Sequence, residues 1–183
     1  MSDILRTDSY VRVNFASSPG WTALHAACEG DHHGIVSILL AHPDIEVNFH
    51  SEGITALVVA CRSGSSDCAA LLLQDAHVNV NLSSRSHTQF REAVENGHIA
   101  VVRWWIALEK PVTTSDLQDL EEPQRTDAET GETFRNRLER RAAVKSLLDQ
   151  FKLDHEKTRR QIQGELNISG SIFLSFLFLP FLL

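Results

Sequence analysis

The sequence has few of the features that mark secreted proteins. It contains three cysteines in 183 residues, too few for a disulfide-rich scaffold. Its opening residues, Met-Ser-Asp-Ile-Leu-Arg, lack the basic region and the apolar run of a secretory signal. Together these absences predict a protein of a reducing compartment, the cytoplasm, with free thiols.

An excess of basic residues is also missing. The chain carries 17 Lys and Arg against 24 Asp and Glu, a formal net charge of −7. Because phosphate contacts need a concentrated basic surface, we expect no nucleic acid among its partners. Residues 115–132 carry seven acidic side chains against one basic, whereas residues 133–165 carry nine basic against five acidic. The simplest interpretation is two solvated stretches, and the alternative is a charged docking surface.

Motifs for chemistry are absent too. The sequence has no Gly-rich phosphate loop, no Walker-type Lys and no G-x-S-x-G elbow. Cys28 and His32 are four residues apart, but no second pair has the spacing of zinc ligands. Cys28 and Cys61 occupy the same position of successive units, described next, and we expect them to fill the core. We therefore expect no enzyme, no catalytic residue, no metal and no cofactor.

What the sequence does contain is a period. Thr22, Thr55 and Thr88 lie 33 residues apart, and each is followed two residues later by a bulky apolar residue. The units agree over about twenty residues. For example, the first unit contains G-W-T-A-L-H-A-A-C at the position where the second contains G-I-T-A-L-V-V-A-C. A fixed period of this length predicts a repeat architecture.

Each unit resembles the ankyrin repeat, whose hallmark T-P-L-H-x-A is present as T-A-L-H-A-A at 22–27. The resemblance covers roughly residues 13–110 and implies an all-α solenoid, in which each unit is a β-turn tip followed by two antiparallel helices. The expected units are 15–47, 48–80 and 81–109. Thr can cap the inner helix of each unit. We expect the two helices of each unit to be separated at Asp31, Gly64 and Gly97.

The hallmark His is present only at His25, being replaced by Val58 and Arg91. The Thr to His hydrogen bonds that the resemblance implies are therefore expected in the first unit alone.

Partial units are expected at both ends of the array. We interpret residues 1–14 as the remnant of an earlier repeat, because four of them lie 34 positions before similar residues. These are Ile4, Leu5, Val13 and Asn14, which correspond to Ile38, Leu39, Val47 and Asn48. After an acidic loop at 110–129, residues 130–166 read as a degenerate fourth repeat that forms a charged helical cap. In that region we expect one long helix, or two helices broken near 152–156.

The apolar tail, 167–183, leaves alternatives open. The run I-F-L-S-F-L-F-L-P-F-L-L at 172–183 is short of the roughly 20 residues that a spanning helix needs. It is a membrane anchor, a helix packed on the cap, or the end of a truncated or misassigned chain. The protein is accordingly a free adaptor, a membrane-tethered adaptor or a fragment of a larger ankyrin protein.

The resemblance implies a binding surface for an unidentified protein partner, formed by turn tips and by the concave face of the inner helices, on a chain expected to be a monomer. Trp21 is either an exposed anchor or a cover for the adjacent unit. The candidate contact residues are Trp21, Glu29, His50, Glu52, Ile54, Val59, Arg62, Arg85, His87, Glu92 and Glu95.

Overall fold

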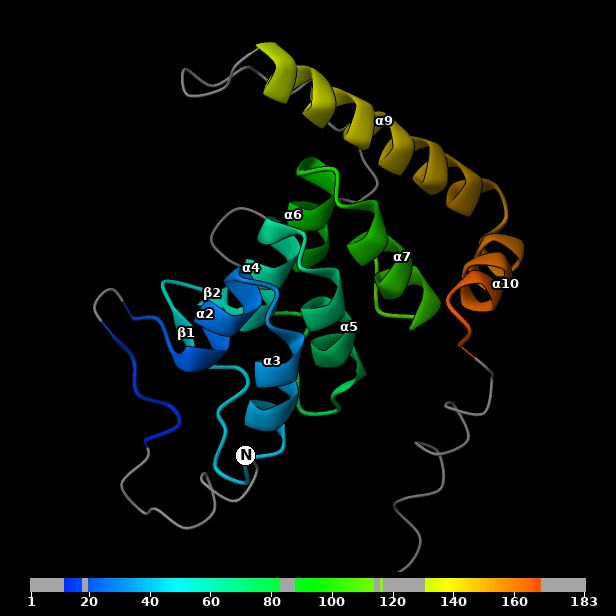
Figure 1. Ribbon diagram of the computed structural model, residues 1–183. Helices are drawn as coiled ribbons and strands as arrows, with labels where there is room; N and C mark the ends of the chain where they lie inside the picture. The colour runs from blue at the N-terminus through cyan, green and yellow to red at the C-terminus, as the bar shows by residue number, and fades with distance from the viewer. Residues whose placement is uncertain (1–11, 18–19, 83–87, 114–115, 117–130, 169–183) are drawn as a thin grey trace, which may run out of the picture.

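The computed structural model describes residues 12–17, 20–82, 88–113, 116 and 131–168 (Figure 1). Three helix pairs lie side by side in chain order, with the inner helices stacked on one another and the outer helices stacked beside them. This arrangement confirms the predicted all-α repeat solenoid. The inner and outer helices of the three units are α2 (Ala23–Glu29) and α3 (His33–Leu40), α4 (Ala56–Ser63) and α5 (Ser66–Gln74), and α6 (Gln89–Glu95) and α7 (Ile99–Ala107).

The periodic threonines begin the inner helices. The Thr55 hydroxyl accepts a hydrogen bond from the backbone N–H of Val58 at 3.2 Å, and Thr88 accepts one from Arg91 N–H at 3.2 Å. Each bond satisfies one of the free N–H groups of a helix's first turn, as expected for an N-cap. The bulky residues that follow are the centre of the core, with exposed fractions of 1–2% at Leu24, Leu57 and Phe90.

The breaks between helices also lie where the sequence predicts them. Asp31, Gly64 and Gly97 have φ values of 52°, 76° and 74°, all in the left-handed region. Gly adopts this region without steric cost, and Asp tolerates it better than most residues. The chain therefore reverses between α2 and α3, α4 and α5, and α6 and α7 at these positions.

The tip of the second unit is a short hairpin. Strands β1 (His50–Ser51) and β2 (Ile54–Thr55) pair antiparallel, with His50 opposite Thr55. The two residues between the strands, Glu52 and Gly53, both have positive φ, 53° and 83°, as a tight type I′ connection requires. This hairpin continues directly into α4.

Asparagines join the loops of successive units. The Asn48 side chain donates to the His77 carbonyl and accepts from Asn79 N–H, both at 2.7 Å. Asn14 makes the same pair of bonds to the loop at 44–46, at 2.7 and 2.9 Å. Asn14 therefore contacts the loop of the first unit as Asn48 contacts that of the second. Residues 1–11 lie outside the described part of the chain, and the N-terminal remnant stays a prediction.

The C-terminal cap differs from the predicted fourth repeat. Helix α9 (Gly131–Leu153) runs for 23 residues without a break, so Val144 and Leu148 do not belong to a separate outer helix. The reason is local, because no Gly or Pro follows Gly131 in this stretch to end the helix. The break comes at Asp154, within the range 152–156, where the carboxylate accepts from Lys157 N–H at 2.9 Å and caps α10 (His155–Glu165).

The cap covers the end of the stack. Helix α9 packs on α6 and α7, and α10 packs on α7 (Figure 1). Val144, Leu148 and Ile162 are buried in this contact, with exposed fractions of 0–3%. Gln163 also donates to the Ala107 carbonyl at 2.8 Å, which ties α10 to the end of α7.

Candidate protein-binding surface

Charged residues form a row across the ends of the inner helices. Glu29, Arg62 and Glu95 lie 33 residues apart, in the last turns of α2, α4 and α6. The Arg62 guanidinium reaches the Glu92 carboxylate through two contacts of 3.4 Å, one to each oxygen. The Arg62 side chain remains 47% exposed, whereas that of Glu92 is 14% exposed. We call Glu29, Arg62, Glu92 and Glu95 the palm row.

The third-unit end of the palm row is held by further contacts. Arg91 donates to the Glu95 carboxylate at 2.6 Å, four residues along the same helix. Arg141 of α9 donates to the Glu95 carbonyl at 3.1 Å, so the cap also contacts this end of the row. At the other end, Glu29 is exposed. Most of the row is therefore held by contacts within the chain.

Val59 does not belong to this surface. Its exposed fraction is 3%, so the prediction that it faces the palm is wrong. Its equivalent in the first unit, Ala26, is exposed, and its equivalent in the third unit, Glu92, lies against Arg62 of the preceding unit. This helix position therefore points toward the preceding unit, which covers Val59 in the middle of the stack.

The tips contribute both exposed and packed residues. His50 and Glu52 of the hairpin are exposed, whereas Ile54 is half-buried against the core. Trp21 is also half-buried, with its ring centroid 6.1 Å from that of His25, so it packs on its own unit while staying partly exposed. Arg85 and His87 lie outside the described residues, and their part in binding stays a prediction.

His25 connects the first unit to the second. Its Nδ1 accepts from the Thr22 backbone N–H at 3.3 Å and lies 2.8 Å from the Thr22 hydroxyl, and its Nε2 donates to the Ile54 carbonyl at 3.1 Å. Burial lowers the pKa of His25, and the bond to Ile54 opposes this only in part. The neutral ring therefore holds the β2 strand against α2, which confirms the Thr to His bonding predicted for the first unit.

Asp116 is a structural residue that the sequence interpretation missed. The sequence predicts a solvated acidic loop here, but the exposed fraction of Asp116 is 1%. Its carboxylate accepts from the Thr88 hydroxyl, and from the N–H and hydroxyl of Thr113 at 2.8 and 2.7 Å. The T-x-x-D spacing of 113–116, typical of a helix N-terminus, is the signal that could have identified it.

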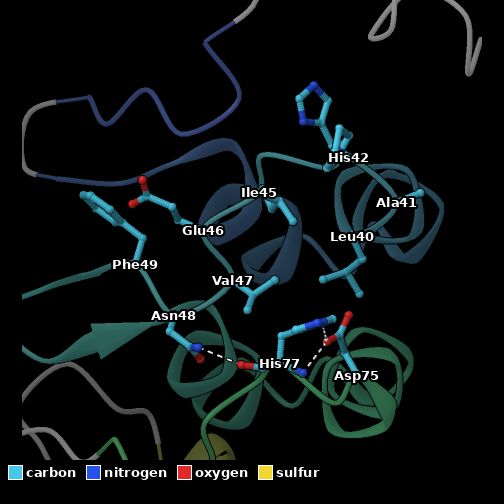
Figure 2. Close-up of a pocket in the computed structure, with 11 residues that line it drawn as sticks. Leu40, Ala41, His42, Ile45, Glu46, Val47, Asn48, Phe49, Asp75 and His77 are labelled. Atoms are coloured by element: carbon cyan, nitrogen blue, oxygen red, sulfur yellow. Dashed lines mark hydrogen bonds and ion pairs between the residues drawn. The ribbon is translucent and has the colours of Figure 1, made fainter. Parts of the chain in front are cut away.

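A separate cavity of 630 Å³ lies where the loops after α3 and α5 meet (Figure 2). Leu40, Ile45 and Val47 form its apolar part, and Asp75 and His77 form a polar side. The His77 side chain lies 3.1 Å from the Asp75 carboxylate, which also accepts from His77 N–H at 2.8 Å. The cavity is at the ends of the outer helices, whereas the palm row is at the ends of the inner helices.

All three thiols lie in the core, as expected for Cys28 and Cys61. Cys28, Cys61 and Cys68 are each 0% exposed. Burial raises the pKa of all three thiols, and that of Cys68 rises to about 12. Because the thiolate is the reactive form, these cysteines fill space and are poor nucleophiles.

Over the described ranges, no group of three His, Cys, Asp or Glu side chains could hold a metal ion. In the same ranges, none of the helices combines the length and apolar character needed to cross a bilayer. The apolar run at 172–183 lies beyond them.

Comparison with known proteins agrees with the fold. The family model for ankyrin repeats, which contains three copies, matches residues 4–84 and again residues 47–116. No curated protein matches the sequence. The matches span more than half of the chain and contain all three inner and outer helix pairs. This chain belongs to the ankyrin-repeat family.

Proposed function

We propose that this protein is a non-catalytic adaptor that binds a partner protein through the palm row and the hairpin tip at His50 and Glu52. The observation that carries the proposal is the Arg62–Glu92 pair, which joins two units on the inner-helix surface while leaving Arg62 half-exposed. Proteins of this family are generally protein–protein interaction modules, which also supports the proposal that the chain binds a partner protein.

The pattern of charge suggests what such a partner presents. Glu29, Arg62 and Glu95 alternate in sign along the palm row. A partner with the opposite alternation would gain specificity and faster association from electrostatic complementarity. Because the row stands on rigid helices and its third-unit end is already paired, little conformational entropy is lost on binding.

A non-catalytic role agrees with the chemistry of the described side chains. The three thiols are buried with raised pKa values, so none is an activated nucleophile. His25 is occupied by Thr22 and by the Ile54 carbonyl. The row itself offers ion pairs, which suit recognition.

Affinity capture from a lysate with matched variants tests the proposal. Arg62→Glu reverses the central charge of the palm row, and we expect at least a tenfold loss of the captured partner, as for a residue near the centre of an interface. Lys152→Glu on α9 is the control, since it makes the same change of charge at a side chain of similar exposure, 45% against 47%. Identical partners and yields for both variants would show that the palm row does not bind.

A membrane-tethered adaptor is the alternative that the apolar run at 172–183 favours. Cell fractionation of the full chain beside a chain that ends at Gly164 separates the two forms. A membrane fraction that is lost on truncation supports the tether. Equal distribution of both chains removes it, and neither outcome affects the palm row.

A further inference from the structure

The 630 Å³ cavity at the ends of the outer helices lies apart from the palm row, and we call it the loop cavity. Its lining comes from the end of α3, the loop that follows α3 and the loop after α5. The eleven lining residues are Leu40, Ala41, His42, Pro43, Ile45, Glu46, Val47, Asn48, Phe49, Asp75 and His77. A cavity of this volume is typical of a ligand cleft.

One part of the loop cavity is apolar. In Figure 2 the side chains of Leu40, Ile45 and Val47 surround one space, with His77 and Asp75 along its edge. Val47 is 8% exposed, and Leu40 and Ile45 are half-buried against the core. The core therefore holds this apolar part in place, and it offers a contact surface for the methylene groups of a ligand.

An ordered carboxylate borders the apolar part. The Asp75 side chain is 18% exposed, and its Oδ1 accepts from His77 N–H at 2.8 Å and lies 3.1 Å from His77 Nδ1. Both contacts go to the same oxygen, and Oδ2 makes no hydrogen bond to the residues that the structure describes. Asp75 therefore keeps one acceptor oxygen for a ligand, while His77 fixes the orientation of the carboxylate.

The charge of the lining favours a cation. Glu46 and Asp75 supply two carboxylates, and none of the eleven lining residues is Lys or Arg. Lys110, which follows α7, is close enough that Asp75 partly offsets the lowering of the lysine pKa by burial. Lys110 and Asp75 nevertheless form no ion pair, although both lie in the described part of the chain. The loop cavity thus combines carboxylate charge with an apolar surface.

We propose that the loop cavity binds a lysine side chain in a segment of a partner protein. A lysine carries an apolar stem and a charged end, so its methylene groups pack on Leu40, Ile45 and Val47 while its ammonium group donates to Asp75 Oδ2. Arginine fits less well, because its planar fork binds a carboxylate through both oxygens and His77 already occupies Oδ1.

The edges of the cavity suit a polypeptide better than a free amine. Ala41, Pro43 and Glu46 are exposed, so residues on either side of the bound lysine have room to continue along the surface. Glu46 lies beside Phe49 at one end of the cavity (Figure 2), where it can attract a second basic residue of the same segment. This contact involves no residue of the palm row and does not depend on the function proposed for that row.

Nuclear magnetic resonance titration of the full chain with the peptide acetyl-Ala-Lys-Ala-amide tests the proposal. We expect changes in the amide signals of residues 40–49 and 75–77. A peptide with norleucine in place of lysine keeps the stem but lacks the charge, and it should bind about tenfold more weakly. The corresponding arginine peptide and butylamine, which has the stem and the ammonium group without a backbone, should both bind more weakly than the lysine peptide.

Asp75→Asn is the decisive variant. It removes the charge but keeps a side-chain oxygen that can accept from His77 N–H, so the loop should retain its conformation. We expect the lysine peptide to bind about tenfold more weakly to this variant. Asp149→Asn on α9 is the control, since it removes the same charge from a 56% exposed side chain of the cap and should leave the affinity unchanged. The amide spectra of both variants report whether the fold is retained.

Several outcomes overturn the proposal. Equal affinity for the lysine peptide and any of the three comparison ligands removes the selectivity for a lysine in a chain. Equal affinity of Asp75→Asn and Asp149→Asn removes the role of the Asp75 carboxylate. Absence of any signal change at the highest soluble peptide concentration removes the site. Arg62→Glu should leave peptide binding unchanged, and a loss of binding in that variant would place the peptide on the palm row instead.

Discussion

At the scale of single residues, His25 makes two contacts, one within its own unit and one to the next unit. It pairs with Thr22 at the start of α2 and donates to the Ile54 carbonyl of the next unit. In the third unit, the threonine at the equivalent position, Thr88, contacts Asp116 from the following loop. The repeat therefore predicts a threonine at the start of each inner helix. The further contacts of that threonine come from side chains that the repeat does not specify.

Acidification should destabilise the protein through His25, which is buried, and His98, which is half-buried. Burial lowers the pKa of His25 and of His98, whose Nε2 donates to the Arg62 carbonyl at 2.9 Å. The unfolded state then binds more protons than the folded state below the ordinary pKa of about 6.5, so the free energy of unfolding falls as the pH drops through this value.

Urea unfolding at about pH 7.5 and about pH 5.5 checks this expectation. The wild type should lose stability between the two, and a chain with both His25→Ala and His98→Ala should lose less. His25→Ala alone should cost on the order of 2–4 kcal/mol at the higher pH, because it also leaves the Ile54 carbonyl unpaired. An equal loss on acidification in the double variant would contradict the assignment.

Gly97→Ala should destabilise the contact between the third unit and the cap. Gly97 has a φ of 74°, and an added Cβ would lie 2.7 Å from the Arg140 Cβ and 2.9 Å from the Arg141 backbone nitrogen. We expect a loss of roughly 2–4 kcal/mol from strain and displaced backbone. Gly164→Ala in α10 is the control, since nothing lies within 4 Å of its new Cβ. There we expect a gain of at most about 1 kcal/mol, measured by urea unfolding.

At the scale of elements, the cap shows what replaces a further repeat at the end of a stack. Helix α9 lacks the break of a repeat, yet α9 and α10 together cover α7 as a further helix pair would. The C-terminal end of the stack is thus closed by a long helix that packs across it. At the N-terminal end, Ile35 of α3 is 46% exposed.

Leu148→Ala should show how much the cap contributes to stability. Leu148 is 3% exposed, and its truncation should cost about 2–4 kcal/mol, from lost burial and the cavity left behind. Leu153→Ala on the same helix, at 88% exposure, should change stability by less than about 0.5 kcal/mol. Thermal unfolding of the two variants beside the wild type makes the comparison. Equal destabilisation of both would mean that α9 does not dock as described.

At the scale of the whole molecule, the stack has no separate core for each unit. Helix α4 has six of its eight residues buried and contacts inner helices on both sides. Stability in such an array comes from contacts between neighbours, so the central unit is held most strongly. The three buried cysteines lie in α2, α4 and α5 and can report on this cooperativity.

Thiol labelling should therefore follow global unfolding. With raised pKa values and no exposed surface, Cys28, Cys61 and Cys68 should resist alkylation in the folded protein. In increasing urea, all three should become reactive at the midpoint seen by circular dichroism. Mass spectrometry of digested, labelled protein identifies each cysteine. Labelling of Cys28 well before the other two would mean that the first unit opens independently of its neighbour.

The sequence by itself determined the repeat and the conformation of its turns. These depend on local chemistry: a threonine that caps a helix, and a residue at 31, 64 or 97 that accepts positive φ. The charged residues of the palm row at 29, 62 and 95 were predictable for the same reason, since they share the period.

Only the tertiary structure decided which equivalent positions are buried. Ala26 and Val59 occupy equivalent positions, yet Ala26 is exposed and Val59 is 3% exposed, because α2 of the preceding unit packs against α4. Likewise, Asp116 is buried because Thr88 and Thr113 approach it from two segments of the chain. A period specifies the unit and its internal geometry. Burial depends on neighbours, which differ between the ends and the middle of the stack.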